Sequence, residues 1–396
     1  MKKIFIGLIL VALFSFLFKH SATKQSMPSR LSPENSAEKA SEACSNYSVG
    51  TILRNTCYAR QMEQITVENG RTFAEKTLSS LQSIDESAKG CHFISHGIGW
   101  GSYKKDPTNW KQAIQESSPL CAYGEQMGII ERYVQAMPDG KFTKEFVPEI
   151  CGDHPRASCN HMVGHMVLLQ TKNDIPKAID YCHSLKTGAQ QSLCFAGMFM
   201  ERVISTNLVE HEIVPKSWAN WPARIFDNEK LCRSYEGELA NTCWRVLGHA
   251  AYYHFNKEPK AIFAFCNSAK SQRASQECKL YAVNEFIGSN GFSFQMVKNI
   301  CSLDRKHDQQ FESLCYNRMA FLKINALGRE KTGDTVAFCS HLGSQFQASC
   351  FQSISYSLKS TQATESQIKK FCLPVPQQYK NLCEHGFSAT ISQNNL

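Results

Sequence analysis

The sequence contains no run of five or more charges of one sign. Its formal net charge is +8, and three of the positive charges lie near the N-terminus, on Lys2, Lys3 and Lys19. The remaining charges are spread along the chain, without the basic patch that marks a nucleic-acid-binding surface. Nucleic acid is therefore not an expected partner.

The catalytic motifs that spacing alone can reveal are also missing. There is no CxxC pair, no phosphate-binding P-loop, no GxSxG nucleophile turn and no dinucleotide fingerprint. The zinc-protease pattern HExxH is absent because Phe93 and Met162 stand where its glutamate would lie. Strand-like alternation of polar and apolar residues is absent as well, which favours helices. The sequence therefore specifies an architecture more clearly than a reaction.

Cysteine is what the chain has in quantity, with 18 residues in 396. A chain of this length can bury a large core without cross-links, so the cysteines are not compensating for a small fold. Their even number, together with an export signal, favours structural disulfides. The expected bonds join consecutive close cysteines: Cys44 with Cys57, Cys151 with Cys159, Cys182 with Cys194, Cys232 with Cys243, Cys266 with Cys278, Cys301 with Cys315, Cys339 with Cys350, and Cys372 with Cys383.

The N-terminus has the pattern of a secretory signal, because Lys2 and Lys3 precede the apolar residues 4–18. The usual small residues of a cleavage site are missing, so residues 1–22 are predicted to be either a signal peptide or an uncleaved N-terminal anchor. The apolar run is shorter than the roughly 20 residues that a spanning helix needs. Residues 23–43 are predicted to be a flexible linker, followed by a cysteine-rich helical repeat domain, 44–396. We expect an exported protein, secreted or periplasmic, with a membrane tether at residues 4–18 if the signal is retained.

A repeat of roughly 36 residues organises the rest of the chain. Its register is set by the second cysteine of each pair, and Cys91 and Cys121 fall in the same register. After each such cysteine comes an amphipathic stretch, then a polar break, then a second apolar stretch that ends at the next cysteine. Pro176 and Pro259 stand where proline suits the first turn of that second helix.

The predicted fold is therefore an all-α solenoid of about ten disulfide-stapled αα-hairpins. Each disulfide joins the end of the second helix of one hairpin to the start of the first helix of the next. Cys91 and Cys121 both begin first helices, and packed helices lie about 8–10 Å apart, farther than a disulfide spans. They are either bonded, if those helix ends converge, or two free thiols.

The period, the hairpin character and the cysteine pairing over residues 44–390 resemble those of cysteine-rich Sel1-like and tetratricopeptide-like solenoids. The resemblance is one of architecture and does not extend to the sequence signatures of those families. It implies a binding scaffold for a protein, a peptide or a surface polymer, and it implies no particular partner.

Histidines follow the register cysteine in alternate repeats, and glutamates follow it in the repeats between. Residues i and i+4 share a helix face, and two imidazoles at that spacing can bind one transition-metal ion. The candidate metal ligands are His92, His96, His161, His165 and His249. The glutamates expected beside them are Glu131 or Glu125 for His96, Glu201 for His165 and Glu285 for His249.

Three interpretations of these residues stay open. They form a metal or ligand site, they catalyse a reaction, or they are buried hydrogen-bonded pairs between neighbouring first helices. Glycines would let those helices approach closely, at Gly97, Gly124, Gly164, Gly197 and Gly248.

The longest insertion contains Trp218 and Trp221, which either anchor a partner or fold back onto the solenoid. The functional hypothesis is a binding or scaffold module that acts through residues 91–285, with Trp218, Trp221, Glu131, Glu201 and Glu285 as ligand-binding residues. The alternative is a metal-binding protein or metal-dependent enzyme that uses the HxxxH pairs with a glutamate from the adjacent repeat.

Overall fold

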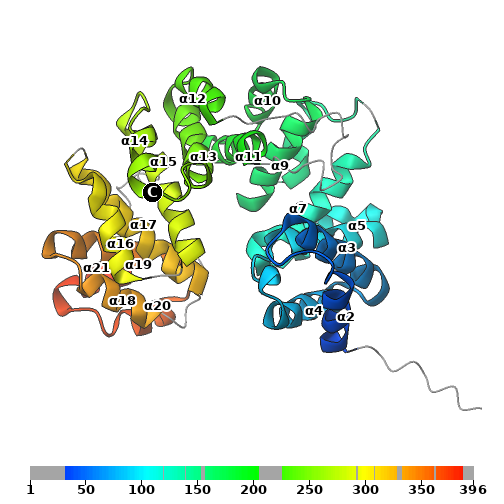
Figure 1. The fold of residues 1–396 in the computed structure, drawn as a ribbon, viewed down its shortest axis with the longest axis horizontal. Helices are drawn as coiled ribbons and strands as arrows, with labels where there is room; N and C mark the ends of the chain where they lie inside the picture. Colours follow the sequence, from blue (N-terminus) through cyan, green and yellow to red (C-terminus); the bar gives the residue numbers. More distant parts are fainter. Residues whose placement is uncertain are drawn as a thin grey trace, which may run out of the picture. The chain divides into compact units, whose positions relative to one another are not determined.

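The computed structural model describes residues 32–118, 120–138, 140–152, 157–204, 225–290, 293–306, 308–327, 332–360 and 363–386. Over these residues the chain is helical and has no strand (Figure 1). It divides into two compact units, Met1–Tyr133 and Val134–Leu396. The expected signal or anchor, residues 1–22, lies outside the described residues. Among the helices that are described, none is long and apolar enough to cross a membrane.

The first unit contains helix α2, the first two hairpins of the chain and most of the first helix of the third hairpin. Its helices are α2 (Pro33–Ala43), α3 (Ile52–Asn69), α4 (Arg71–Ile84), η1 (Glu86–Lys89), α5 (His92–Lys105), η2 (Pro107–Asn109), α6 (Trp110–Glu116) and most of α7 (Leu120–Gln135). Helix α3 packs along α5, and α2 packs along α4. The core between them is built of small and aliphatic side chains with one tyrosine, Tyr58.

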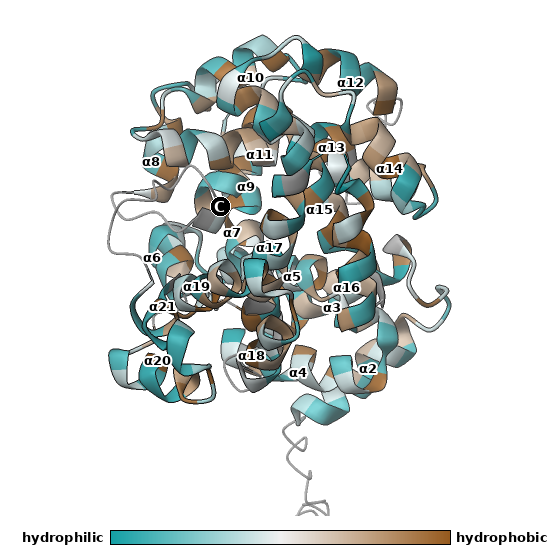
Figure 2. Cartoon of the chain, turned by 90° about the vertical axis from the view of Figure 1, so that its left-hand side faces the viewer, coloured by the Kyte–Doolittle hydropathy of each residue, from teal (hydrophilic) through white to brown (hydrophobic). Residues whose placement is uncertain are grey.

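The second unit repeats the same hairpin. Its helices are α8 (Val147–Cys151), α9 (Ala157–Gln170), α10 (Ile175–Cys182), α11 (Gly188–Ile204), α12 (Ile225–Arg233), α13 (Gly237–His254), α14 (Pro259–Cys266), α15 (Gln272–Asn290), α16 (Phe294–Cys301), η4 (Ser302–Asp304), α17 (Gln309–Leu327), α18 (Thr332–Ser340), α19 (Ser344–Ser360), α20 (Glu365–Cys372), η6 (Gln377–Tyr379) and α21 (Lys380–His385). The first helices of successive hairpins pack in chain order from α9 to α21. The helices contain both hydrophobic and hydrophilic residues, as amphipathic helices with one buried face do (Figure 2).

The predicted all-α repeat is confirmed. Every register cysteine lies in, or immediately before, the first helix of a hairpin. The second helices begin as the sequence predicts: Asp174 accepts a hydrogen bond from the amide of Lys177 at the start of α10, and Pro176 lies in that first turn. Pro259 opens α14 in the same way.

All eight predicted cysteine pairs are bonded. The bonds are Cys44 with Cys57, Cys151 with Cys159, Cys182 with Cys194, Cys232 with Cys243, Cys266 with Cys278, Cys301 with Cys315, Cys339 with Cys350, and Cys372 with Cys383. Cys266 is typical, because it is the last residue of α14 and bonds to Cys278 in the second turn of α15. The predicted staple between a second helix and the next first helix is therefore confirmed.

Cys91 and Cys121 form a ninth bond, so no cysteine is free. Across the nine disulfides, the Cα–Cα distances lie between 5.4 and 5.8 Å. These are ordinary distances for a disulfide. Nine such bonds indicate that the chain folds in an oxidising environment.

The Cys91–Cys121 bond exists because α5 and α7 approach more closely than ordinary packed helices. A Cβ atom added to Gly99 would lie 2.1 Å from the carbonyl oxygen of Glu125, and one added to Gly124 would lie 2.1 Å from that of His92. The helices touch through their backbones, and their N-terminal ends therefore converge. This resolves the alternative that the sequence left open in favour of the bonded pair.

The predicted flexible linker at residues 23–43 is wrong for its last eleven residues, which form α2. Ser32 caps this helix by accepting a hydrogen bond from the amide of Asn35, and Pro33 occupies its first turn. Ala37 and Ala40 are buried against the first unit, and Cys44 ties the end of the helix to α3. The Ser-, Lys- and Glu-rich composition suggested a linker, although the alanines of this segment form the buried face of a helix. The predicted repeat domain, 44–396, extends over both compact units.

Buried ion pairs fix helix junctions in both units. In the first unit Arg54 pairs with Asp85, which also accepts a 2.6 Å hydrogen bond from the hydroxyl of Tyr58. Burial by itself would raise the pKa of Asp85, but the hydrogen bonds from Tyr58 and Arg54 lower it below its ordinary value. In the second unit the fully buried Lys279 pairs with Asp304. These pairs connect first helices to the segments that end the second helices.

Candidate functional site

Three histidines on first helices bond through Nδ1 to a glutamate on the first helix of the next hairpin. The pairs are His96–Glu131 at 3.1 Å between α5 and α7, His165–Glu201 at 2.7 Å between α9 and α11, and His249–Glu285 at 2.7 Å between α13 and α15. These are the pairs that the repeat spacing predicts, and their pairing is confirmed. Whether they bind a ligand or a metal stays a prediction.

The glutamates determine how the histidine rings are oriented. Glu131 and Glu201 are buried, whereas Glu285 is partly exposed. In each pair the carboxylate accepts the hydrogen that Nδ1 carries, which fixes the direction of the ring. The Nε2 atoms are therefore the ring nitrogens that these histidines present to other groups.

In the second unit the two histidines of α9 face each other. Nε2 of His165 lies 3.2 Å from Nε2 of His161, and their ring centroids are 4.9 Å apart. The backbone of Leu193 in α11 also hydrogen-bonds to His161. Burial, followed by the proximity of His165, lowers the pKa of His161 to about 3, so this ring is neutral at physiological pH.

The first unit has a similar pair on α5. Nδ1 of His92 lies 2.9 Å from the carbonyl oxygen of Cys121 on α7, and the ring centroids of His92 and His96 are 5.2 Å apart. Nε2 of His96 is buried and has no hydrogen-bond partner among the residues that the structure describes. Both HxxxH pairs are thus held by hydrogen bonds from their Nδ1 side to the next first helix.

Backbone contact between helices accompanies each of these pairs. A Cβ atom on Gly164 or Gly248 would lie 1.9 Å from a carbonyl oxygen of the facing helix, and one on Gly197 would lie 1.8 Å from that of His161. A Cβ atom on Gly97 of α5 would likewise lie 1.9 Å from the carbonyl oxygen of Ala59 on α3. The predicted role of the glycines in close helix approach is confirmed. It brings histidine and glutamate within hydrogen-bonding reach across the interface.

Two aromatic residues join these pairs, and the sequence interpretation missed both. Nε1 of Trp100 donates to Glu131 at 2.9 Å, and the hydroxyl of Tyr253 donates to Glu285 at 3.2 Å. Each follows its histidine by four residues and so shares the same helix face. Extending the i, i+4 pattern by one more turn would have found them.

Glu125, considered as an alternative partner for His96, instead lies near α4. Its Oε2 accepts a hydrogen bond from the amide of Ser118 at 2.9 Å, and its Oε1 lies 3.6 Å from Nε of Arg71. Burial raises the pKa of Glu125 to about 7, although the Ser118 amide and Arg71 both oppose the shift. This makes it the buried carboxyl with the clearest pH dependence in the first unit.

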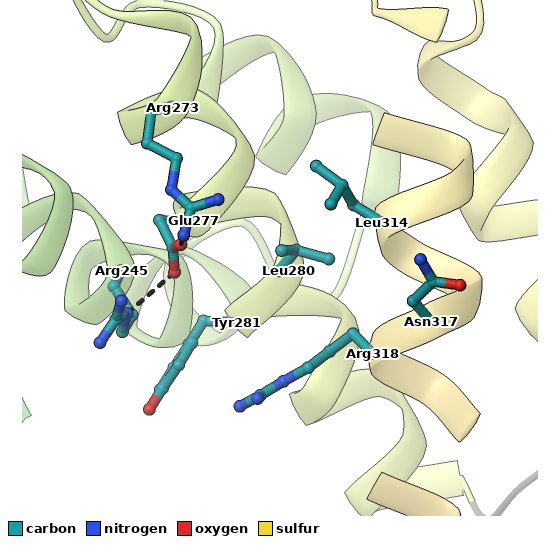
Figure 3. A pocket seen from close by; sticks show the side chains of 8 residues that line it. All are labelled: Arg245, Arg273, Glu277, Leu280, Tyr281, Leu314, Asn317 and Arg318. Atoms are coloured by element: carbon teal, nitrogen blue, oxygen red, sulfur yellow. Dashed lines mark hydrogen bonds and ion pairs between the residues drawn. The ribbon is translucent and has the colours of Figure 1, made fainter. Parts of the chain in front are cut away.

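A pocket of about 100 Å³ in the second unit lies between α13, α15 and α17 (Figure 3). Its lining contains three arginines and one carboxylate. The residues are Arg245, Arg273, Glu277, Leu280, Tyr281, Leu314, Asn317 and Arg318. At physiological pH this lining carries two more positive than negative charges.

The arginines of this pocket are unequally paired. Arg245 and Arg273 both bond to Glu277, at 2.9 and 2.8 Å. Arg318 forms no ion pair with the described residues, and its side chain extends toward Tyr281 (Figure 3). Glu277 therefore pairs with two arginines, and Arg318 has no carboxylate partner among the residues that the structure describes.

The sequence interpretation did not identify this pocket. Arg245 occupies the position at which the earlier repeats have His92 and His161. Arg273 and Arg318 lie on different helices and share no sequence pattern with it. Trp218 and Trp221, predicted to bind a partner, lie outside the described residues.

The described residues contain no cluster of three or more histidine, cysteine, aspartate or glutamate side chains arranged to hold a metal ion. No protein-family model, curated protein or solved structure matches the chain.

Proposed function

We propose that this chain is an exported helical-repeat protein that binds an anionic group of a protein, peptide or surface polymer in the pocket between α13, α15 and α17. The observation that carries the proposal is the charge of that pocket, where Glu277 is shared by Arg245 and Arg273 while Arg318 lacks an ion pair with the described residues. An anion would complete the pairing.

The residue types suit a group with two or more oxygen atoms. Guanidinium groups bind carboxylate, phosphate and sulfate through paired N–H···O bonds. A volume of about 100 Å³ suits one acidic side group of a larger molecule.

The rigid repeat supports this function. Disulfides next to the pocket, Cys243 to Cys232 and Cys278 to Cys266, fix α13 and α15 to their neighbouring second helices. Preorganised arginines lose little conformational freedom on binding, which favours affinity. Most of the lining belongs to residues 91–285, the half expected to be functional, and α17 extends it. Export is supported by the oxidising environment that the disulfides require.

The test is binding of a fluorescent poly-glutamate peptide, a simple acidic probe, to purified full-length protein. Arg318→Gln is expected to weaken binding about tenfold, the typical effect of losing one charge-assisted bond of ~1.4 kcal/mol. Lys298→Gln makes the same charge change on an exposed residue of α16, and it should change affinity less than twofold. Equal effects of the two substitutions would show non-specific attraction and would overturn the proposal.

A further inference from the structure

A second cavity of the second unit is lined by α16, α17 and α18, and α17 packs against both of the other two helices. Its volume is about 310 Å³. The lining consists of Phe294, Lys323, Asp334, Ala337, Phe338 and His341. Small-molecule sites have volumes of roughly 300–1,000 Å³ and combine apolar or aromatic walls with a few polar groups. This cavity has that size and composition, and among the described lining residues none is shared with the pocket between α13, α15 and α17.

Three rings form the wall of this cavity. Phe294, the first residue of α16, lies edge-on to Phe338 of α18 with ring centroids 5.6 Å apart, and its ring centroid is 5.8 Å from that of His341. Phe338 is buried, so packing fixes its ring. Nδ1 of His341 donates a 2.6 Å hydrogen bond to the carbonyl oxygen of Ala337, which fixes the imidazole. The wall is therefore preorganised to contact an apolar or aromatic group.

Two opposite charges complete the lining. Nζ of Lys323 on α17 lies 3.5 Å from the backbone carbonyl oxygen of Asp334, which places the ammonium beside the first turn of α18. The side chain of Asp334 is exposed, and its carboxylate makes no hydrogen bond or ion pair with another residue that the structure describes. The formal charges of Lys323 and Asp334 cancel. This cavity therefore differs from the arginine-lined pocket, which has an excess of positive charge.

We propose that this cavity binds a free α-amino acid with an apolar or aromatic side chain. A lining with one charge of each sign is complementary to a molecule that carries one of each, whereas a net anion or cation leaves one lining charge opposed by a like charge. The ligand carboxylate accepts hydrogen bonds from Lys323, and the ligand ammonium donates to Asp334. The ligand side chain contacts the rings of Phe294 and Phe338. One carbon atom joins the two charged groups of an α-amino acid, which suits an ammonium and a carboxylate that lie side by side.

Isothermal titration of L-phenylalanine into the full-length protein tests the proposal. Two analogues separate the charges: N-acetyl-L-phenylalanine lacks the ammonium, and L-phenylalanine amide lacks the carboxylate. Each should bind about tenfold more weakly than L-phenylalanine, because each leaves one charge of the lining without its partner. These comparisons use the unaltered protein, so they do not depend on a variant folding. Equal binding of all three compounds, or no binding of L-phenylalanine, would overturn the proposal.

A substitution then locates the site. Asp334→Asn removes the negative charge with little change in shape, so it should weaken binding of L-phenylalanine about tenfold and change the affinity for N-acetyl-L-phenylalanine less than twofold. Asp227→Asn is the matched control, because Asp227 is also an exposed acidic residue in the first turn of a second helix, α12. It should leave both affinities unchanged. Equal effects of the two substitutions would show that the ligand does not contact Asp334, and would contradict the proposal.

Discussion

At the scale of single residues, Glu125 shows how burial alone can make a side chain sensitive to pH. The carboxyl group is 2% exposed and has one amide donor, while the guanidinium of Arg71 stays 3.6 Å away. Nearby Glu75 adds a second negative charge. Desolvation therefore outweighs the favourable contacts, and the pKa rises to about 7.

The raised pKa predicts how stability depends on pH. Between about pH 4.5 and 7 the folded chain holds a proton on Glu125 that the unfolded chain has lost, so the contribution of Glu125 to stability falls as pH rises. Above about pH 7 the contribution of Glu125 to stability stays at its lower value. Glu125→Gln should therefore stabilise the protein more at pH 8 than at pH 5, by up to about 3 kcal/mol at ~1.4 kcal/mol per pKa unit. Urea unfolding at both pH values measures this difference.

Glu116→Gln is the control for this substitution, because its side chain is 52% exposed on the neighbouring helix α6. It should have the same small effect on the unfolding free energy at both pH values. A pH-independent effect of Glu125→Gln would show that this carboxyl group is not desolvated in solution.

At the scale of helices, backbone contact sets the geometry of the interfaces that carry histidine and glutamate. Gly197 of α11 lies against the carbonyl of His161 on α9, and a methyl group there has no room. Gly188 begins the same helix, and nothing lies within 4 Å of the position its Cβ would take. The two glycines thus differ in packing while sharing a helix.

Gly197→Ala should destabilise the second unit by about 3 kcal/mol, because α11 must move away from α9 to accept the methyl group. The same movement would lengthen the His165–Glu201 bond. Gly188→Ala should change stability by less than about 1 kcal/mol, and in the favourable direction, since alanine is the better helix former. Urea unfolding midpoints compare the two. Equal effects would mean that α9 and α11 are not in backbone contact.

At the scale of the whole molecule, disulfides are distributed over both units and join segments that are close in sequence. The bond between Cys91 and Cys121 belongs to the first unit and spans 30 residues, whereas that between Cys151 and Cys159 belongs to the second and spans 8. In the chain-entropy description, a longer closed loop constrains the unfolded state more.

Replacing Cys91 and Cys121 by serine should therefore destabilise the first unit by about 3.6 kcal/mol, and replacing Cys151 and Cys159 should destabilise the second by about 2.5 kcal/mol. Because the units are compact by themselves, scanning calorimetry should show two transitions, and each double substitution should lower a different one. If both variants lowered the same transition, the two units would not unfold independently.

The sequence by itself determined what depends on separations of a few residues or on one repeat. The sequence predicted eight disulfides between cysteines that are 8 to 14 residues apart, such as Cys151 with Cys159 and Cys301 with Cys315. These predictions succeeded because the turn between two helices brings no other cysteine as close. The period of about 36 residues then placed a histidine beside the glutamate of the next repeat. Helical periodicity is a local property, so it can be recognised from the order of the residues.

Only the tertiary structure decided what depends on how closely helices approach. The bond between Cys91 and Cys121 required the backbone contact of α5 with α7, and the anion-binding pocket that we propose required Arg318 of α17 to lie near Arg245 of α13. The facing Nε2 atoms on α9 likewise required hydrogen bonds to α11. These features follow from distances and side-chain directions across interfaces, which steric fit sets and residue spacing does not encode.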